Sequence, residues 1–147
     1  MNQRSLHYYF VVAGVLMLLA GGMVYLLCRP HTILINHVAS YLGFDPLLAN
    51  MRDWMQTHRL SHLWVYSLPA GLWAASYVTI VHAFSKSLSL FERLSFAALM
   101  PLVGALSELL QGIGLVPGTF DPIDIVCYIT PYLLYFAIML FSRNKHL

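Results

Sequence analysis

Four long apolar stretches occupy more than half of the chain and restrict it to one class of fold. They cover about residues 8–28, 62–84, 93–111 and 122–141. Each has roughly 20 residues, the length that an α-helix needs to cross the ~30 Å hydrocarbon core of a bilayer. Because 59% of the residues are hydrophobic and only 10% are charged, nothing outside these stretches can form a second core. The sequence therefore predicts an all-α integral membrane protein, with a single domain of four transmembrane helices over residues 1–147.

Proline residues interrupt three of the predicted spans. Pro101 lies midway along the third span, and Pro131 lies inside the fourth. Pro69 leaves two alternatives for the second span: the helix kinks there, or it begins there with Ser67 as its cap and Pro69 in its first turn. Carbonyl groups freed by proline are tolerated in lipid only where neighbouring groups bind them. We therefore expect these helices to pack against one another.

Lysine and arginine residues predict the orientation. With four spans, the N-terminus, the second loop and the C-terminus share one side of the membrane. Because positive residues are retained on the cytoplasmic side, we expect both termini in the cytoplasm and the protein in a bacterial inner membrane. The first loop and the turn between the last two spans then face outward. The inner side has five positive residues, Arg4, Lys86, Arg93, Arg143 and Lys145, and the outer side has three, Arg29, Arg52 and Arg59.

The long first extracytoplasmic loop contains a predicted amphipathic helix. Asp45 can cap this helix, and Pro46 suits its first turn. Arg52 belongs to its polar face, opposite an apolar face. The pattern fits a helix that lies on the outer membrane surface, and equally one that packs over the mouth of the bundle. The apolar face consists of Leu47, Leu48, Met51, Trp54 and Met55.

The turn between the last two spans is rich in polar residues. Glu108 and Gln111 are three residues apart and share a helical face near the outer end of the third span. Gly104 lies one turn earlier on that face, where close approach of another helix would bury the carboxylate. After a short loop with glycine and proline, Asp121 and Asp124 are again three apart. These four polar residues could converge on one pocket.

The acidic residues of this turn also have structural interpretations. The segment from Asp121 to Asp124 is typical of a helix start. Asp121 is the capping residue, Pro122 suits the first turn, and the negative charge of Asp124 is favourable near the positive end of the helix. Glu108 lies about one turn inside the apolar boundary, where an ionised group without a partner is costly. It has either a functional role or a purely structural hydrogen-bonding role. As a functional pair, carboxylates serve as acid and base or bind a divalent cation.

Histidine, cysteine and aromatic residues give weaker signals. His58 and His62 are four apart, but the segment between them lacks the glutamate of a zinc-peptidase motif, so we predict no metal site and no cofactor. Cys28 and Cys127 are expected to be apolar structural residues, with a disulfide as the alternative. A net charge of +2, scattered along the chain, does not suggest a nucleic-acid partner. Anchoring at the membrane interface is the expected role of Trp54, Trp64 and Trp73.

The order Glu108-x-x-Gln111, a short Gly/Pro loop and Asp121-x-x-Asp124 resembles the VanZ-like family of small bacterial multi-pass membrane proteins. The resemblance covers about residues 93–141. It implies an inner-membrane protein, in a family with some members associated with resistance to glycopeptide antibiotics. The resemblance also implies that the glutamate, the glutamine and the two aspartates of this pattern are candidate site residues. The chain has Gly118, Tyr128 and Pro131 where the family tends to have arginine, asparagine and glycine.

Two hypotheses about function follow. In the first, the outward acidic pocket binds or modifies a lipid-linked or cell-envelope molecule, with Glu108, Gln111, Asp121 and Asp124 as binding residues and Glu108 and Asp124 as catalytic candidates. In the second, the chain is a non-enzymatic subunit or accessory protein of a larger membrane complex, or a homo-oligomer. Small residues in the first span would then allow a partner helix to approach closely. These residues are Ala13, Gly14, Ala20, Gly21 and Gly22.

Overall fold

The computed structural model describes residues 3–28, 34–57, 61 and 63–144. All regular structure in these segments is helical. The long helices are joined by short turns, except that two shorter helices fill the loop after the first. The elements are α1 (Gln3–Cys28), α2 (Leu34–Tyr41), α3 (Asp45–Thr57), the π-helical turn η1 (Leu63–Ser67), α4 (Leu68–Phe84), α5 (Leu90–Gly112) and α6 (Pro122–Asn144).

Among the described residues, three helices are long and apolar enough to cross a membrane, which indicates a membrane protein. They are Ser5–Cys28 in α1, Leu90–Gly112 in α5 and Pro122–Ser142 in α6. The predictions of the first, third and fourth spans are confirmed to this extent. Exposed leucine, valine, isoleucine and phenylalanine side chains cover the outer faces of these helices, as lipid contact requires. The remaining long helix of the bundle is α4, which lies within the predicted second span. It has 17 residues and is shorter than the other three.

Helix α5 begins at Leu90, three residues before the predicted start of the span. The reason is a capping box that the sequence analysis overlooked. The Ser89 hydroxyl accepts a hydrogen bond from the Glu92 backbone N–H at 3.3 Å, and the Glu92 carboxylate accepts one from the Ser89 N–H at 2.8 Å. Together these bonds satisfy two backbone donors that a helix start otherwise leaves unpaired.

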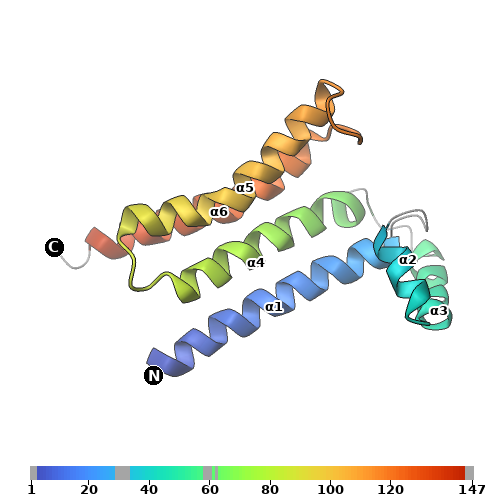
Figure 1. Ribbon diagram of the computed structural model, residues 1–147, viewed down its shortest axis with the longest axis horizontal. Coiled ribbons are helices and arrows are strands. Elements are labelled where there is room, and N and C mark those ends of the chain that lie inside the picture. Colours follow the sequence, from blue (N-terminus) through green and yellow to red (C-terminus); the bar gives the residue numbers. More distant parts are fainter. Residues whose placement is uncertain (1–2, 29–33, 58–60, 62, 145–147) are drawn as a thin grey trace.

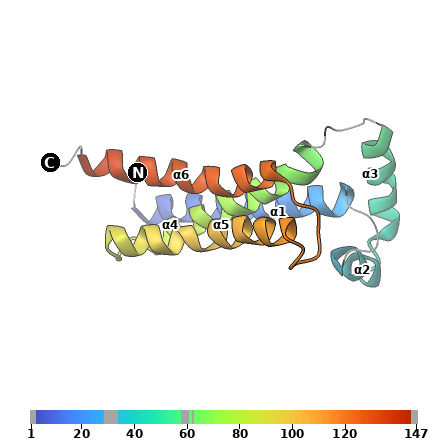
Figure 2. The ribbon, with the colours of Figure 1, turned by 90° about the horizontal axis from the view of Figure 1, so that it is seen from above.

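Helix α4 occupies the centre of the bundle and packs against α1, α5 and α6 (Figure 1; Figure 2). Most of its buried residues are small, so the neighbouring helices lie close to its backbone. The start of α1, the α4–α5 turn and the end of α6 lie at one end of the bundle. The α5–α6 loop, together with α2 and α3, lies at the other end. We call this second end the loop end.

Close packing of α1 on α4 depends on two glycines of the first span. A Cβ atom at Gly14 would lie 2.5 Å from Cγ1 of Ile80, and one at Gly21 would lie 2.7 Å from Nε1 of Trp73. The buried Ser76 hydroxyl donates a hydrogen bond to the Gly14 carbonyl at 2.7 Å. These two members of the predicted small-residue stripe therefore pack against another helix of the same chain.

Two side-chain hydroxyls donate to helix carbonyls near the prolines within α5 and α6. The Tyr77 hydroxyl of α4 donates to the Phe96 carbonyl of α5 at 2.9 Å, five residues before Pro101. Within α6, the Thr130 hydroxyl donates to the Val126 carbonyl at 2.7 Å, next to Pro131. The first of these bonds joins α4 to α5 inside the bundle.

The two alternatives for Pro69 are both partly realised. This residue lies in the first turn of α4, as the second alternative states, and Ser67 occupies the N-cap position. However, the Ser67 side chain makes no capping hydrogen bond, and its backbone is itself helical. The π-helical turn η1 leads directly into α4, so the helical path continues on both sides of the proline.

Helices α2 and α3 form a short unit at the end of α1 (Figure 1; Figure 2). The sequence analysis did not predict α2. Leu27 of α1, Ala39 of α2 and Leu48 of α3 form one buried apolar cluster. Arg52, expected on the polar face of α3, is only 6% exposed and donates a hydrogen bond to the Leu26 carbonyl at 3.0 Å. An arginine is favourable at this position because it can donate to the last carbonyls of α1, which have no partner within their own helix.

Candidate functional site

Glu108 is buried where α5 and α6 come together at the loop end. Its side chain is only 6% exposed. One turn earlier, Gly104 leaves room for Tyr128 of α6: a Cβ atom at Gly104 would lie 2.5 Å from Cδ1 and 2.8 Å from Cγ of this ring. The predicted close approach at Gly104, and the burial of Glu108 that follows from it, are both confirmed.

The Glu108 carboxylate connects α5 to the end of the α5–α6 loop. Its Oε1 accepts a hydrogen bond from Nε2 of Gln111 at 3.3 Å. Its Oε2 accepts one from the backbone N–H of Asp121, also at 3.3 Å. Both bonds are long for this atom pair, so each oxygen can still accept a stronger donor.

The two aspartates differ in their surroundings. Asp121 Oδ1 accepts a hydrogen bond from the Ile123 backbone N–H at 2.8 Å, which is the capping role expected of a helix start. Asp124, in the first turn of α6, is half-buried, and its Oδ1 atom is fully buried without a hydrogen-bond partner among the described residues. The helix-start interpretation therefore accounts for the bond from Ile123 to Asp121, but it leaves the Asp124 Oδ1 atom without a donor among the described residues.

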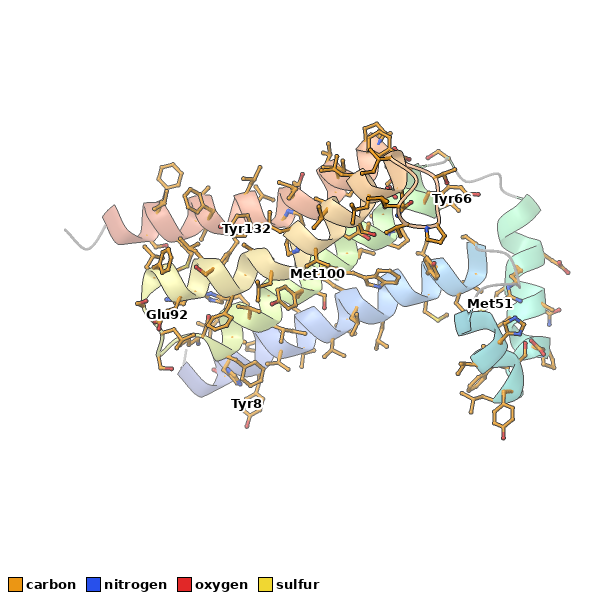
Figure 3. All side chains as sticks on the ribbon, turned by 45° about the horizontal axis from the view of Figure 1, so that its top comes forward. Tyr8, Met51, Tyr66, Glu92, Met100 and Tyr132 are labelled. Carbon is orange, nitrogen blue, oxygen red and sulfur yellow. The ribbon has the colours of Figure 1, made fainter. Side chains whose placement is uncertain are left out.

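These residues line a pocket of about 580 Å³ at the loop end. All four predicted site residues, Glu108, Gln111, Asp121 and Asp124, contribute to it, so the structure brings them together. None of the described residues in its wall is a lysine, arginine or histidine. Figure 3 labels Tyr66 at this end of the bundle and Glu92 at the opposite end. The other lining residues are Tyr25, Tyr66, Pro69, Ala70, Trp73, Pro117, Gly118, Thr119, Phe120 and Tyr128.

The aromatic wall of the pocket was not predicted. Trp73 was assigned to membrane-interface anchoring, yet its indole packs against Gly21 and lies 5.3 Å from the ring of Tyr25, measured between ring centroids. Tyr128 lies four residues after Asp124, on the same face of α6, and this spacing was visible in the sequence. The contribution of Tyr25 was not visible, because it depends on how α1 packs against α4.

Gly118 shapes the loop beside the amide of Gln111. Its φ of 145° is in the region that only glycine adopts readily. A side chain there would collide with the Gln111 amide, so this residue lets the loop pass directly over the site.

Metal and thiol chemistry receive no support from the described residues. Among them, no three histidine, cysteine or acidic side chains are placed to hold a metal ion. His58 and His62 lie outside the described residues. Cys28 and Cys127 are free thiols in this structure, in agreement with the structural interpretation of both residues.

A second polar cluster lies at the opposite end of the bundle and was also not predicted. Nη2 of Arg93 lies 3.4 Å from Nδ1 of His82, which in turn is 3.4 Å from the Tyr135 hydroxyl. The ring of His82 contacts Phe10, with a centroid distance of 4.7 Å. The adjoining cavity of about 390 Å³ has mostly apolar walls. This cluster joins α1, α4, α5 and α6, and none of its hydrogen bonds among the described residues involves a carboxylate, so we interpret it as a packing interaction.

No protein-family model, curated protein or solved structure matches the chain. The chemistry of the loop-end pocket is therefore the main guide to function. This pocket offers three carboxyl groups, one amide and several aromatic faces. Such a set can accept hydrogen bonds, exchange protons and attract positive charge.

Proposed function

We propose that this chain is a VanZ-like protein of the bacterial inner membrane, and that its outward acidic pocket binds the headgroup of a lipid-linked or cell-envelope molecule. The observation that supports this most strongly is Glu108, a buried carboxylate at the end of an apolar helix, which lines the 580 Å³ pocket. A carboxylate in this position costs stability unless a compensating interaction is gained. Two long hydrogen bonds are a weak compensation for a group that serves only the fold.

We propose further that η1 and α4 together form the predicted second span, so that the chain crosses the membrane four times. At 1.5 Å per residue, the 17 residues of α4 extend about 26 Å, and η1 adds a further turn. The position of α4 between the three longer helices favours a membrane location for it as well. With four spans and more positive residues at the opposite end, the pocket faces outward and both termini are cytoplasmic.

Within the pocket, we assign different roles to the polar residues. Glu108 and Asp124 contact the ligand, because the first has two long hydrogen bonds and the second has a buried oxygen without a partner among the described residues. Asp121 and Gln111 position the site, Asp121 by capping α6 and Gln111 by holding the Glu108 carboxylate. Should the ligand also be modified, Glu108 and Asp124 are the residues that would transfer protons.

Native mass spectrometry of the gently extracted protein tests this proposal. Wild type is compared with Glu108→Gln, which keeps the side-chain volume, and with Asp53→Asn, which removes an acid outside the pocket. We expect a lipid-sized adduct on wild type and Asp53→Asn, and its loss from Glu108→Gln at equal abundance in the membrane. The proposal fails if Glu108→Gln retains the adduct, or if wild type has none.

The alternative, a subunit of a larger membrane complex, is less well supported. The small-residue stripe of the first span suggested this alternative, but two of its members, Gly14 and Gly21, already pack against α4 of the same chain. A Cβ atom added at Gly22 would meet no described residue within 4 Å, so this position is still open to a partner helix. The same spectra separate the two proposals, because a stoichiometric protein partner on both wild type and Glu108→Gln, without a lipid adduct, would favour the complex.

A further inference from the structure

The charge and hydrogen-bonding capacity of the loop-end pocket indicate which chemical group it accepts. Resting on the proposed function, we infer that the pocket recognises a primary ammonium group carried by an amphiphile such as an amine-bearing lipid. Three properties of the wall support this inference: three acids with no positive side chain among the described lining residues, the buried Asp124 oxygen without a donor among them, and several aromatic side chains.

The acids give the sign of the ligand charge. Glu108, Asp121 and Asp124 all line the pocket, and no described lining residue has a positive side chain. Among the described residues, the donors to Glu108 are an amide and a backbone N–H, both neutral. A phosphate or carboxylate group would meet like charges here, whereas a cation would satisfy acceptors that the protein leaves weakly bound.

Asp124 distinguishes between types of cation. Its Oδ1 atom is buried and has no donor among the described residues. Burial of an acceptor without a donor is unfavourable, so a ligand that supplies an N–H removes this penalty. A primary ammonium has three N–H donors, but a trimethylammonium group has none. The pocket is therefore suited to a primary amine rather than to a quaternary one.

Aromatic faces complete the site. Tyr25, Tyr66, Trp73 and Tyr128 reach the pocket from α1, η1, α4 and α6. Aromatic rings attract cations at their faces, and tryptophan does so most strongly. Because rings and carboxylates surround one cavity, a cation bound there meets favourable charge on several sides.

The depth of the pocket favours a headgroup as the source of the amine. Glu108 lies four residues before the last residue of α5, about 6 Å along the helix axis, and Asp121 immediately precedes α6. This depth places the carboxylates at the boundary between hydrocarbon and headgroups. A lipid in the adjacent leaflet could reach the pocket with its headgroup while its chains stay among the apolar faces of α5 and α6.

The test titrates the full-length protein in detergent with single lipids and counts adducts by native mass spectrometry. The probes are phosphatidylethanolamine, its N-acetylated form, phosphatidylcholine and phosphatidylglycerol. We expect phosphatidylethanolamine to bind at least about tenfold more tightly than the other three, since a hydrogen bond between charged groups is worth roughly 1.5–3 kcal/mol. Asp124→Asn should remove most of this preference, whereas Asp53→Asn should keep it. Free ethanolamine is added as a competitor: displacement at equal concentration would support the same chemistry with a soluble amine as its source.

The possible results separate this inference from the proposed function. Equal binding of phosphatidylglycerol or the N-acetylated lipid would overturn the inference, and equal binding of phosphatidylcholine would overturn the need for N–H donors. Either result leaves the proposed function intact if Glu108→Gln still abolishes the adduct. If no lipid binds in a Glu108-dependent way, the proposed function itself fails. The lipid series on wild type is informative even if Asp124→Asn does not fold.

Discussion

Replacement of Gly104 by alanine should separate α5 from α6 at the candidate site. The added Cβ atom would lie 2.5, 2.7 and 2.8 Å from Cδ1, Cε1 and Cγ of Tyr128. Cγ is the ring atom nearest to the Tyr128 backbone, so rotation of the ring about its own axis cannot relieve this contact. Either the tyrosine changes its rotamer or α6 moves away, and each change disturbs the wall of the pocket.

The expected cost follows from the size of this overlap. Insertion of a methyl group into a well-packed interface costs about 1–3 kcal/mol. Glycine to alanine also gains roughly 0.5–1 kcal/mol of helix propensity, which partly hides that cost. Gly22→Ala is the matched control, because a Cβ atom there has no neighbour within 4 Å. The propensity gain is common to both variants, so their difference in the free energy of unfolding isolates the overlap at about 1–3 kcal/mol.

Reversible unfolding in mixed detergent micelles, followed by circular dichroism, measures this difference. We expect Gly104→Ala to unfold at a lower denaturant fraction than wild type and Gly22→Ala at an equal or higher one. Equal stability of the two alanine variants would refute the close contact between α5 and α6, and with it the explanation for the burial of Glu108.

Three further predictions concern other parts of the bundle. Ser89→Ala removes the capping box of α5 and should lower the free energy of unfolding by about 1 kcal/mol, measured by the same unfolding assay; no change would mean that the box does not stabilise the helix start. Ser76→Ala removes the buried hydrogen bond to the α1 backbone and should cost about 0.6 kcal/mol relative to Ser95→Ala, a control at an exposed position of α5; equal stabilities would count against that bond. Arg52→Met detaches α3 from the end of α1, so a maleimide should modify Cys28 several-fold faster than in wild type, whereas an unchanged rate would show that α3 is held in another way.

The sequence was most informative about residues near one another along the chain. Glu108 with Gln111, and Asp121 with Asp124, were recognisable because a spacing of three residues places side chains on one helical face. The start of α6 at Pro122 and the need for close approach at Gly104 followed from equally local rules. Ser89 with Glu92 is also a local signal, and α5 would have been predicted to begin at Leu90 had it been used.

The sequence by itself determined the class of the protein, because long apolar segments have few alternatives to helices in a membrane. It also determined which polar residues could share a face. Only the tertiary structure decided that Tyr25 and Trp73 face these acids, that Gly14 and Gly21 are used by α4, and that Arg52 is buried at the end of α1. These contacts join segments far apart in the chain, and they depend on the rotation and depth at which apolar helices pack. Many such arrangements bury similar apolar area, so the choice among them depends on the fit of individual side chains.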